Sequence, residues 1–570
     1  MKCSAFSSLL VLLPLAYAWE EQSVLASTTT PSLKLYIQTP SSLVSHTALA
    51  TAVSQVLNSG QVRDVLAAEA DEVLNGKPSH RLLHVDNLRE PNEKYERNSF
   101  RAVVADYENG RTVYVNVDDA LGPLSEASVE ITNHQPLPNE EELLDAASIA
   151  GFGPNATVFS RMPVIVHETN PDGSTPRILR IEAGNSSKEV LRLFDVNMYT
   201  RTATPVQRPQ ALQSCQAVWE NKSVQGVKGK VLEAAGRTAH VKITDSANNA
   251  LWELDVTRPR SSSGNMGSGV DLTEVRYKNR LVLKQAHLPM LNVNYLEVVK
   301  DCGPTFRDWQ NEEYPFDCPG KDTLPGFREC TGGRSKTFVD GRPDAEGFRG
   351  VSFDVYDDNV VIRSQLKADW YRYVSQWTLS ANGTIAPRWG FGGVNQADLH
   401  CVCVKHHHHA FWRLDFDIET SKNNEVRQCD GNKCTAQKFT GRMEKADNRY
   451  WDIVNTASNR GYRLTPGKTD RKASDPEDTS KYFVGDLWLV KADALRDDGC
   501  TTIRGQWPPE STDCTQANFN AIKMSQEESS VQHQDQVLWY SASYMHWQGH
   551  EDATGGNHWV GPLLEPIGTW

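Results

Sequence analysis

Short segments in which hydrophobic and polar residues alternate, with the period of two that is typical of a β-strand, run through most of this 570-residue chain. Near the N-terminus the spacing is helical instead, with candidate helices at residues 41–57 and 62–74. Strand-like segments follow at residues 81–85, 100–106 and 112–117. Asn109-Gly110 joins the last two and is a hairpin signal, because both residues tolerate a left-handed backbone. This order predicts a small helix-plus-sheet unit.

The same order of elements recurs once. Pro136-Leu137-Pro138-Asn139 interrupts the pattern and offers Asn139 as the N-cap of a helix. Three glutamates at residues 140–142 would lie in its first turn, where the helix dipole favours negative charge, and we expect the helix to reach about residue 150. Strand-like segments then come at residues 162–167, 177–181 and 190–199. A second unit therefore repeats the layout of the first, although not its residues.

Thr204-Pro205 and Pro209 mark a linker, beyond which many short strands alternate with Gly, Pro, Asn and Asp turns. A clear hairpin is expected there, with strands at residues 370–378 and 385–391 around the turn at residues 381–384. Few long helices are expected, which is typical of a large antiparallel sandwich. We therefore predict a mainly β protein, α+β overall, in which a large antiparallel β-sandwich follows two small α+β domains. The expected boundaries are 1–18 for a signal peptide, 25–132 and 133–208 for the small domains, and 209–570 for the sandwich.

The N-terminal segment and the cysteine content predict that the protein is secreted. Residues 1–18 combine Lys2, an apolar run and a small-residue end, which is typical of a cleaved secretory signal. No later stretch is long and apolar enough to span a bilayer, so we expect a secreted, soluble protein without membrane contact. Ten cysteines remain after Cys3 is removed with the signal, and in an oxidising compartment an even number predicts disulfides. Sequons fit a glycoprotein, at Asn155, Asn185, Asn221 and Asn382.

The formal charge of −13, without a basic cluster, argues against nucleic acid as a partner. Cationic small molecules would instead be drawn to such a surface.

The densest set of potential metal ligands is the run from His406 to His409, far from either end of the chain. On a strand, His406 and His408 share one face, and the other face holds His407, His409, Asp415 and Asp417. Imidazoles two residues apart suit copper or zinc, whereas the carboxylates suit a hard, oxygen-preferring ion. One strand can therefore serve two sites.

Copper in a tetragonal site takes three or four imidazoles, so at least one more must come from elsewhere. Residues 537–546 form a strand pattern that ends in His546, and His550 and His558 follow. Spacing alone does not choose between these three histidines. A different interpretation is a zinc cluster of residues that share one strand parity, Cys401, Cys403, His407 and His409, although disulfides are more usual than thiolates in an exported chain.

Several of these segments together resemble the central core of the copper amine oxidases. They are Trp370-Tyr371-Arg372-Tyr373 with Trp377, Gly383-Thr384-Ile385, His406-x-His408 and Leu414-Asp415-Phe416-Asp417. In that family a tyrosine beside the copper is oxidised to topaquinone, and an H-x-H pair plus one distant histidine bind the metal. The resemblance implies that Tyr371 is the quinone precursor and that the copper(II) ligands are His406, His408 and His546. His546 is preferred because Glu551-Asp552 follow it, as in the family.

The resemblance extends over nearly the whole mature chain. Residues 288–295 and 306–309 are similar to the segments that hold a conserved tyrosine and the catalytic base, which implies Tyr295 and Asp308 for these roles. The second, calcium-like site of the family maps onto Asp415, the Phe416 carbonyl, Asp417 and Asp535, in agreement with the strand parity. The two small domains match the paired N-terminal domains of the family in order and size.

The function implied is that of a secreted homodimeric oxidase that converts small primary amines to aldehydes with dioxygen and releases hydrogen peroxide and ammonia. Asp308 would remove the α-proton of the substrate, and Tyr295 would hydrogen-bond a quinone oxygen. The family has Asn-Tyr-(Asp or Glu)-Tyr around the modified tyrosine, whereas this chain has Trp370 and Arg372 at the flanking positions. These two departures favour an alternative, a secreted copper-binding relative that forms no quinone and has no amine oxidase activity.

Overall fold

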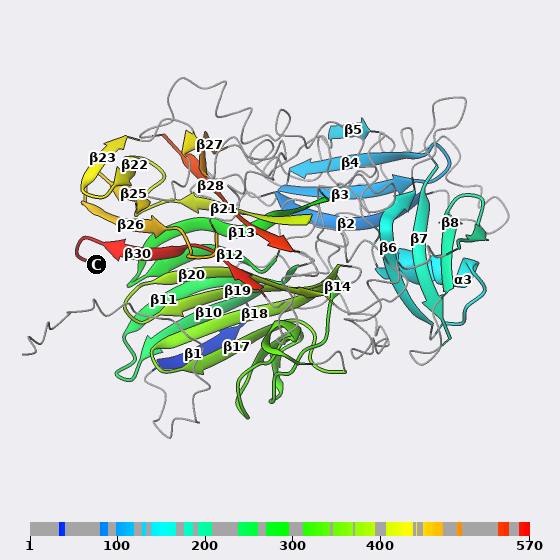
Figure 1. Ribbon diagram of the computed structural model, residues 1–570, viewed down its shortest axis with the longest axis horizontal. Helices are drawn as coiled ribbons and strands as arrows, with labels where there is room; N and C mark the ends of the chain where they lie inside the picture. The colour runs from blue at the N-terminus through cyan, green and yellow to red at the C-terminus, as the bar shows by residue number, and fades with distance from the viewer. Residues whose placement is uncertain are drawn as a thin grey trace, which may run out of the picture.

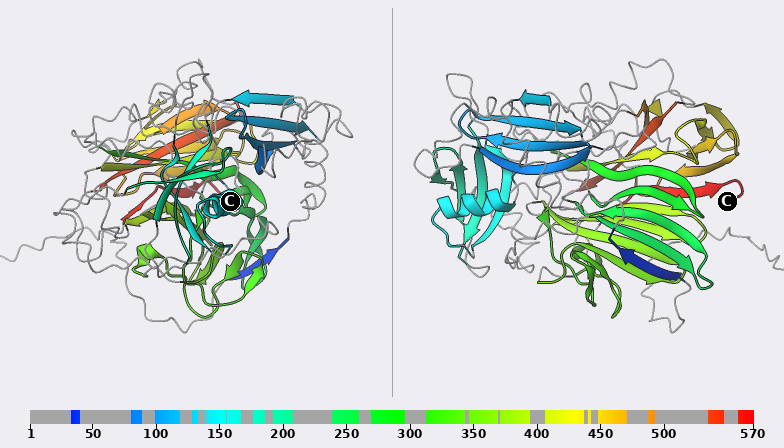
Figure 2. Two further views of the ribbon diagram at one scale, coloured as in Figure 1. Left: turned by 90° about the vertical axis from the view of Figure 1, so that its right-hand side faces the viewer. Right: turned by 180° about the vertical axis from the view of Figure 1, so that it is seen from behind.

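The computed structural model describes residues 33–39, 80–88, 99–118, 128–132, 138, 140–154, 156–166, 176–185, 192–207, 238–259, 269–295, 312–342, 346–368, 371–393, 406–436, 440–441, 448–470, 487–492, 534–546 and 558–570. These residues form two large and two small β-sheets (Figures 1 and 2). The large sheets fill one end of the molecule, and the second small sheet lies at the other end. No helix among the described residues is long and apolar enough to cross a membrane.

The first small sheet has four antiparallel strands in chain order, β2(His80–Leu88), β3(Ser99–Asp106), β4(Arg111–Asp118) and β5(Ser128–Thr132). It confirms the three strands and the hairpin predicted from the sequence. Gly110 has a φ of 60°, the left-handed conformation that the turn requires, and the Asp106 carboxylate accepts a hydrogen bond from the Asn109 backbone. The helices expected at residues 41–57 and 62–74, and the signal peptide expected at 1–18, lie outside the described residues.

The second small sheet is covered by the predicted helix. Helix α3(Glu140–Ile149) precedes four antiparallel strands, β6(Thr157–Val166), β7(Ile178–Gly184), β8(Arg192–Asn197) and β9(Thr202–Pro205). Leu143, Ala146 and Ala147 are buried in one cluster with β7 residues, which explains why this face of the helix is apolar. The helix ends at Ile149, and Gly151 just beyond it has a φ of 87°, the left-handed conformation that commonly follows a helix C-cap. Asn139, the expected N-cap, lies outside the described residues.

A buried ionic cluster joins the two small units. Glu142 of α3 receives two hydrogen bonds from Arg177, at 2.6 and 2.7 Å, and one from the Tyr107 hydroxyl of the first unit at 2.8 Å. All three side chains are almost completely buried. Burial raises the pKa of Tyr107, and the neighbouring Glu142 carboxylate raises it further, so the phenol stays protonated and can donate. The helix is thereby bound to both sheets.

One sheet of the sandwich has nine strands. In spatial order they are β1(Leu33–Gln38), β10(Thr238–Asp245), β11(Ala250–Thr257), β12(Asp271–Tyr277), β13(Arg280–Tyr295), β21(His406–Phe416), β28(Gln536–His546), β27(Leu487–Lys491) and β24(Thr440–Gly441). Strand β1 falls within the range 25–132 expected for the first small domain, yet it pairs with β10 of the large sheet. Its burial alternates along the strand, as suits an edge strand with one covered face.

The other large sheet has thirteen strands. In spatial order, eleven of them are β15(Asp322–Leu324), β16(Phe327–Glu329), β17(Val351–Tyr356), β18(Asn359–Ala368), β19(Tyr371–Ser380), β20(Ile385–Gly393), β30(Leu563–Ile567), β26(Arg460–Thr465), β25(Arg449–Asn455), β22(Asn424–Asp430) and β23(Lys433–Ala436). Two more strands pair beside this path, β14(Glu312–Glu313) with β18 and β29(His558–Val560) with β20. The β19–β20 hairpin confirms the predicted one, with Gly383 at a φ of 93° in its turn.

The two large sheets enclose one continuous core. It includes five fully buried tryptophans from both sheets, Trp252, Trp377, Trp389, Trp412 and Trp451. The large antiparallel sandwich predicted from the sequence is therefore confirmed, and its interior is a wide aromatic layer. This layer positions the site described below.

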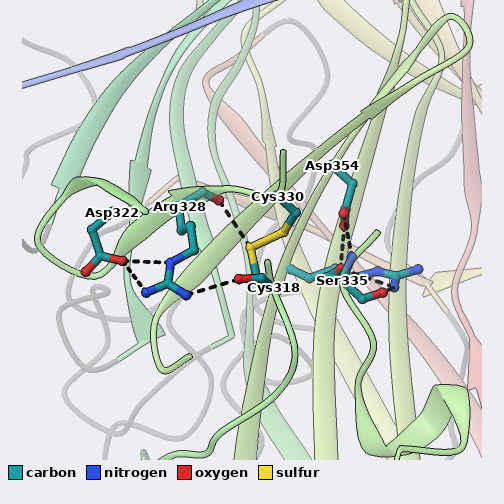
Figure 3. The surroundings of a disulfide bond; sticks show 7 residues. Cys318, Asp322, Arg328, Cys330, Ser335 and Asp354 are labelled. Carbon is teal, nitrogen blue, oxygen red and sulfur yellow. Dashed lines mark hydrogen bonds and ion pairs between the residues drawn. A yellow bond between two sulfur atoms is a disulfide. The ribbon is translucent and has the colours of Figure 1, made fainter. Parts of the chain in front are cut away.

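Two disulfides lie in the described part of the chain, Cys318–Cys330 and Cys429–Cys434. Figure 3 shows the first of them in the irregular segment before β17, where the Arg328 guanidinium donates to Asp322 and to the Cys318 carbonyl. Nearby, Asp354 accepts hydrogen bonds from the backbone and the hydroxyl of Ser335. Burial still raises the pKa of Asp354 above its usual range.

The Glu142–Arg177 pair provides a test of the small units. Arg177→Met leaves the Glu142 carboxylate buried without its cation, and we expect it to destabilise α3 by about 3–5 kcal/mol. Native-state hydrogen exchange of the α3 amides measures this free energy. Arg180→Met is the matched control, because its partner Asp195 is about a fifth exposed, and it should cost roughly 1 kcal/mol or less. Equal effects of the two substitutions would contradict this account.

Candidate metal centre

Strand β21 lies between β13 and β28 and sets the geometry of the site. The register pairs His406 with Tyr295 on β13 and with His546 on β28, so these residues form one row across three strands. The row that contains His408 also contains Val293 and Tyr544. Directly paired residues share a face of the sheet, as do residues two apart on one strand. His406, His408 and His546 therefore occupy the same face.

That face is turned towards the second large sheet. Ala410, Trp412 and Leu414 continue it along β21, and all three belong to the core between the sheets. His408 itself is completely buried. The three predicted copper ligands thus occupy positions on the inner face of the sandwich.

Tyr371, the predicted quinone precursor, begins strand β19 in the facing sheet. Its ring is 1% exposed and meets the ring of His408 edge-on, with centroids 4.8 Å apart and planes at 89°. Tyr373 stacks on Tyr371 at 5.6 Å, and its hydroxyl lies 3.5 Å from Nδ1 of His408. The structure therefore brings the predicted tyrosine against one predicted ligand, although the two lie 37 residues apart in the chain.

The register also separates the three candidates for the distant histidine. His546 is directly opposite His406, whereas His558 lies on β29 in the other sheet. The ring of His558 stacks on Tyr544 at 3.7 Å and lies 5.0 Å from that of Phe391, which itself lies 4.4 Å from the ring of His408. His550 is outside the described residues. His546 is therefore the candidate that the strand pairing favours.

Three aromatic residues that the sequence did not single out complete the surroundings of His408. The rings of Phe391 and Trp389 lie 4.4 and 5.9 Å from it, and Tyr544 is its cross-strand neighbour. Phe391 and Trp389 come from β20, so their role depends on how the two sheets pack, which local patterns do not encode. Tyr544 could have been found, because it lies two residues before His546 and shares its face.

Arg372, one of the departures from the family pattern, is buried beside Tyr371. Its Nη1 donates to the Tyr371 carbonyl at 2.9 Å, and its guanidinium lies 4.2 Å above the ring of Tyr314. As a strand neighbour of Tyr371, it occupies the opposite face of β19. It therefore holds the main chain of Tyr371 from outside the sandwich. Trp370 and Asp308 lie outside the described residues, and of Tyr295, His406 and His546 only the backbone positions are described.

The predicted second site lies on the other face of β21. Asp415, Asp417 and Asp535 are all buried and bring one carboxylate oxygen each to within 4.8 Å of one another. Phe416, whose carbonyl is the fourth expected ligand, lies between the first two on the chain. Burial raises the pKa of Asp417 to about 9, and the charges of Asp415 and Asp535 contribute. Such a set of hard oxygen donors suits Ca²⁺, whose charge would offset their mutual repulsion.

The same face carries His407 and His409, two members of the zinc cluster considered above. Both are completely buried, and burial, reinforced by His407, lowers the pKa of His409 well below its usual value. Cys401 and Cys403 lie outside the described residues.

No family model matches the sequence, and no curated protein sequence is detectably similar to it. The structure is similar to that of a copper-containing benzylamine oxidase from Hansenula polymorpha, with a TM-score of 0.51 and 11% identity over 83% of this chain and 88% of that chain. A lysyl oxidase from Pichia pastoris gives 0.47 and 12%, over 86% and 85% of the two chains. An Aspergillus nidulans amine oxidase gives 0.42 and 13%, over 83% and 80%.

The first of these similarities shows that the chain has a copper amine oxidase-like fold. It confirms the mainly β class and the family resemblance of the fold that the sequence predicts.

The acidic cluster predicts a pH-dependent response to calcium. Because the pKa of Asp417 is raised on folding, the calcium-free protein takes up a proton here as it folds, and this contribution to its stability falls as pH rises from about 4 towards 9. Protons compete with Ca²⁺ for the carboxylate, so Ca²⁺ should raise the thermal unfolding midpoint more at pH 8.5 than at pH 6. Scans in calcium and in chelator measure the two shifts.

Asp417→Asn should remove most of the calcium-induced shift. Asp354→Asn, which alters a buried carboxylate outside the cluster, should leave it unchanged. A calcium response that is independent of pH, or that persists in Asp417→Asn, would show that the ion binds elsewhere.

Proposed function

We propose that this chain is a secreted copper- and topaquinone-dependent oxidase that converts small primary amines to aldehydes and releases hydrogen peroxide and ammonia. Dioxygen would be its second substrate, and a homodimer its working form. The observation that carries the proposal is the edge-on contact between Tyr371 and His408 across the two sheets. A buried phenol against a histidine of an H-x-H strand is the arrangement that this chemistry needs.

The residues present fit copper. Three imidazole-bearing positions lie on one face in adjacent strands, and neutral nitrogen donors suit Cu(II). The hydroxyl of Tyr373 lies near Nδ1 of His408, and such a contact on the other ring nitrogen orients a metal-binding imidazole. His406, His408 and His546 would hold the metal. Bound copper would let dioxygen oxidise the ring of Tyr371 to the quinone, which would then accept electrons from the amine.

The other residues would position the substrate and move its proton. Asp308 would take the proton from the carbon next to the amine nitrogen, a step for which a carboxylate of raised pKa is suited. Tyr295 shares a row with His406, from which its hydroxyl would donate to an oxygen on the ring of residue 371. Tyr373, Trp389 and Phe391 are buried around His408 and would exclude water from the reacting groups. The overall charge of −13 would attract protonated amines to the surface.

A second candidate function is that of a copper-binding relative without a quinone. The specific observation in its favour is Arg372, which is buried against Tyr314 and anchors the main chain of Tyr371. At the position of Arg372 the family has an acidic residue, whereas this chain has a cation. The residue that anchors the main chain of Tyr371 therefore differs in charge from that of the family. In this case copper would bind and Tyr371 would stay a phenol.

One experiment separates the two functions. The copper-free protein is loaded with copper in air, and the Tyr371 peptide is analysed by mass spectrometry. We expect the mass of the quinone form, absorbance after phenylhydrazine is added, and hydrogen peroxide release with at least one member of a panel of primary amines.

Tyr371→Phe should abolish all three signals while copper still binds, because its ligands remain. Tyr356→Phe is the control, since it removes the hydroxyl of a different tyrosine, a half-buried one on β17, and it should keep all three. Copper-loaded protein that stays colourless with an unmodified Tyr371 would exclude the oxidase and support the copper-binding alternative.

A further inference from the structure

The hairpin of β22 and β23 carries two cysteines that lie directly opposite each other. The register pairs Cys429 with Cys434, and a disulfide links them. Strand β23 is the last strand of the thirteen-stranded sheet, and all four of its residues are exposed, whereas Cys429 on β22 is completely buried. One half of this disulfide therefore lies on an exposed edge strand and the other half in the protein interior.

The hairpin does not depend on this disulfide for its fold. Only five positions separate the two cysteines, and the stabilisation that a cross-link gives decreases as its loop becomes shorter. Strand β22 pairs with β25 over its whole length, from Asn424 to Asp430. The Arg449 guanidinium donates to both oxygens of Asp430, at 2.5 and 3.0 Å, and the Tyr450 hydroxyl donates to the Gly431 carbonyl. We therefore expect both sulfurs to keep their places when the disulfide opens.

The Asp452 carboxylate is placed to stabilise the reduced form. Its Oδ2 lies 3.9 Å from Sγ of Cys429, within reach of a hydrogen bond from a thiol. A sulfur in a disulfide carries no proton, so only the reduced form can donate to this carboxylate. Arg463 donates to both oxygens of Asp452, at 2.8 and 3.0 Å, and holds the carboxylate in this position. A hydrogen bond that forms only after reduction shifts the equilibrium towards the two thiols.

We propose that Cys429–Cys434 is a redox-active disulfide that undergoes thiol–disulfide exchange with small thiols. The thiolate of the small molecule attacks Sγ of Cys434, because this cysteine is the exposed one. The protein S–S bond breaks, and Cys429 leaves as a thiolate and takes up the proton that the attacking thiol has lost. A second small thiol then displaces the first from Cys434. Two small thiols are thereby oxidised to their own disulfide, and the protein disulfide is reduced to two thiols.

The other disulfide in the described part of the chain has the surroundings of a structural cross-link. Cys318 and Cys330 are twelve positions apart in an irregular segment, and Cys318 is buried with Phe316 and Phe348 in a small apolar cluster. When reduced, Cys318 would find only a neutral acceptor, the Arg328 carbonyl at 3.8 Å (Figure 3). The longer loop and the poorer access both favour the oxidised form. This pair is therefore an internal reference in the same molecule.

Equilibration of the full chain with glutathione tests the proposal. The native protein is held in mixtures of reduced and oxidised glutathione, quenched with acid and unfolded, and its free thiols are alkylated. Trypsin then cleaves after Lys433, between the two cysteines, so each is quantified on its own peptide. We expect the equilibrium constant for reduction of Cys429–Cys434 to exceed that of Cys318–Cys330 by at least about tenfold.

Two variants separate the role of Asp452 from a general loosening of the sheet. Asp452→Asn removes the charged acceptor and should lower the equilibrium constant for reduction of Cys429–Cys434 several-fold. Arg463→Gln breaks the same ion pair but keeps the carboxylate, so it is the matched control and should not lower the constant. Equal losses in the two variants would overturn the role assigned to Asp452.

Two further variants identify the sulfur that is attacked. With oxidised glutathione, the native Cys429→Ser protein should form a mixed disulfide at Cys434, because the remaining thiol is exposed. The native Cys434→Ser protein should leave Cys429 unmodified, because that thiol is buried. Both results are read as a mass change of the intact chain and located on the tryptic peptides.

Reduction of Cys429–Cys434 only together with Cys318–Cys330, or only in the unfolded protein, would overturn the proposal. Modification of Cys429 in place of Cys434 would overturn the assigned order of attack. None of these measurements requires copper, a quinone or an amine, so their outcome is independent of the proposed function.

Discussion

The pairing of β21 between β13 and β28 is the constraint on which the rest of the structure depends. Because side chains alternate along a strand, a one-residue slip of β21 would exchange its two faces. His408 would then leave the aromatic layer, and Asp415 would enter the core in place of Leu414. The apolar residues Ala410, Trp412 and Leu414 fix the register through their burial between the sheets. Hydrophobic packing in one half of the strand therefore sets the positions of the histidines in the other half.

The sandwich keeps charged and apolar groups apart on this strand. The inner face combines imidazole with rings that exclude water, whereas the outer face gathers Asp415, Asp417 and Asp535 with Arg413, whose guanidinium lies 3.4 Å from Asp415. Burial, and then the neighbouring carboxylates of Asp415 and Asp535, raise the pKa of Asp417. Hard oxygen donors are thus gathered at the far end of the outer face, which also carries the imidazoles of His407 and His409, whereas the inner face carries imidazole among aromatic rings. The separation follows from strand geometry and needs no extra loops.

Many elements of the fold, and the two faces of the histidine strand, could be predicted from the sequence, because they depend on local periodicity. The hairpins at Asn109-Gly110 and Asn382-Gly383, helix α3 and the parity of β21 are all properties of short segments. The contacts that join segments could not be predicted in this way. Phe391 reaches His408 only because β20 packs across the sandwich, and β1 joins the large sheet although the small units follow it in the chain. The grouping of Asp535 with Asp415 came from family resemblance and not from any spacing.

Arg372 shows how a fold can be kept while the surroundings of its central residue change. The edge-on contact of Tyr371 with His408 depends on the inner face of β19, and this face consists of aromatic and apolar residues that pack as the sandwich requires. Arg372 is on the outer face, where its cation is stabilised by the Tyr314 ring and the Tyr371 carbonyl. The two faces of one strand are thus subject to different constraints. A change of charge on the outer face can therefore alter the freedom of the Tyr371 main chain without moving its ring from the inner face.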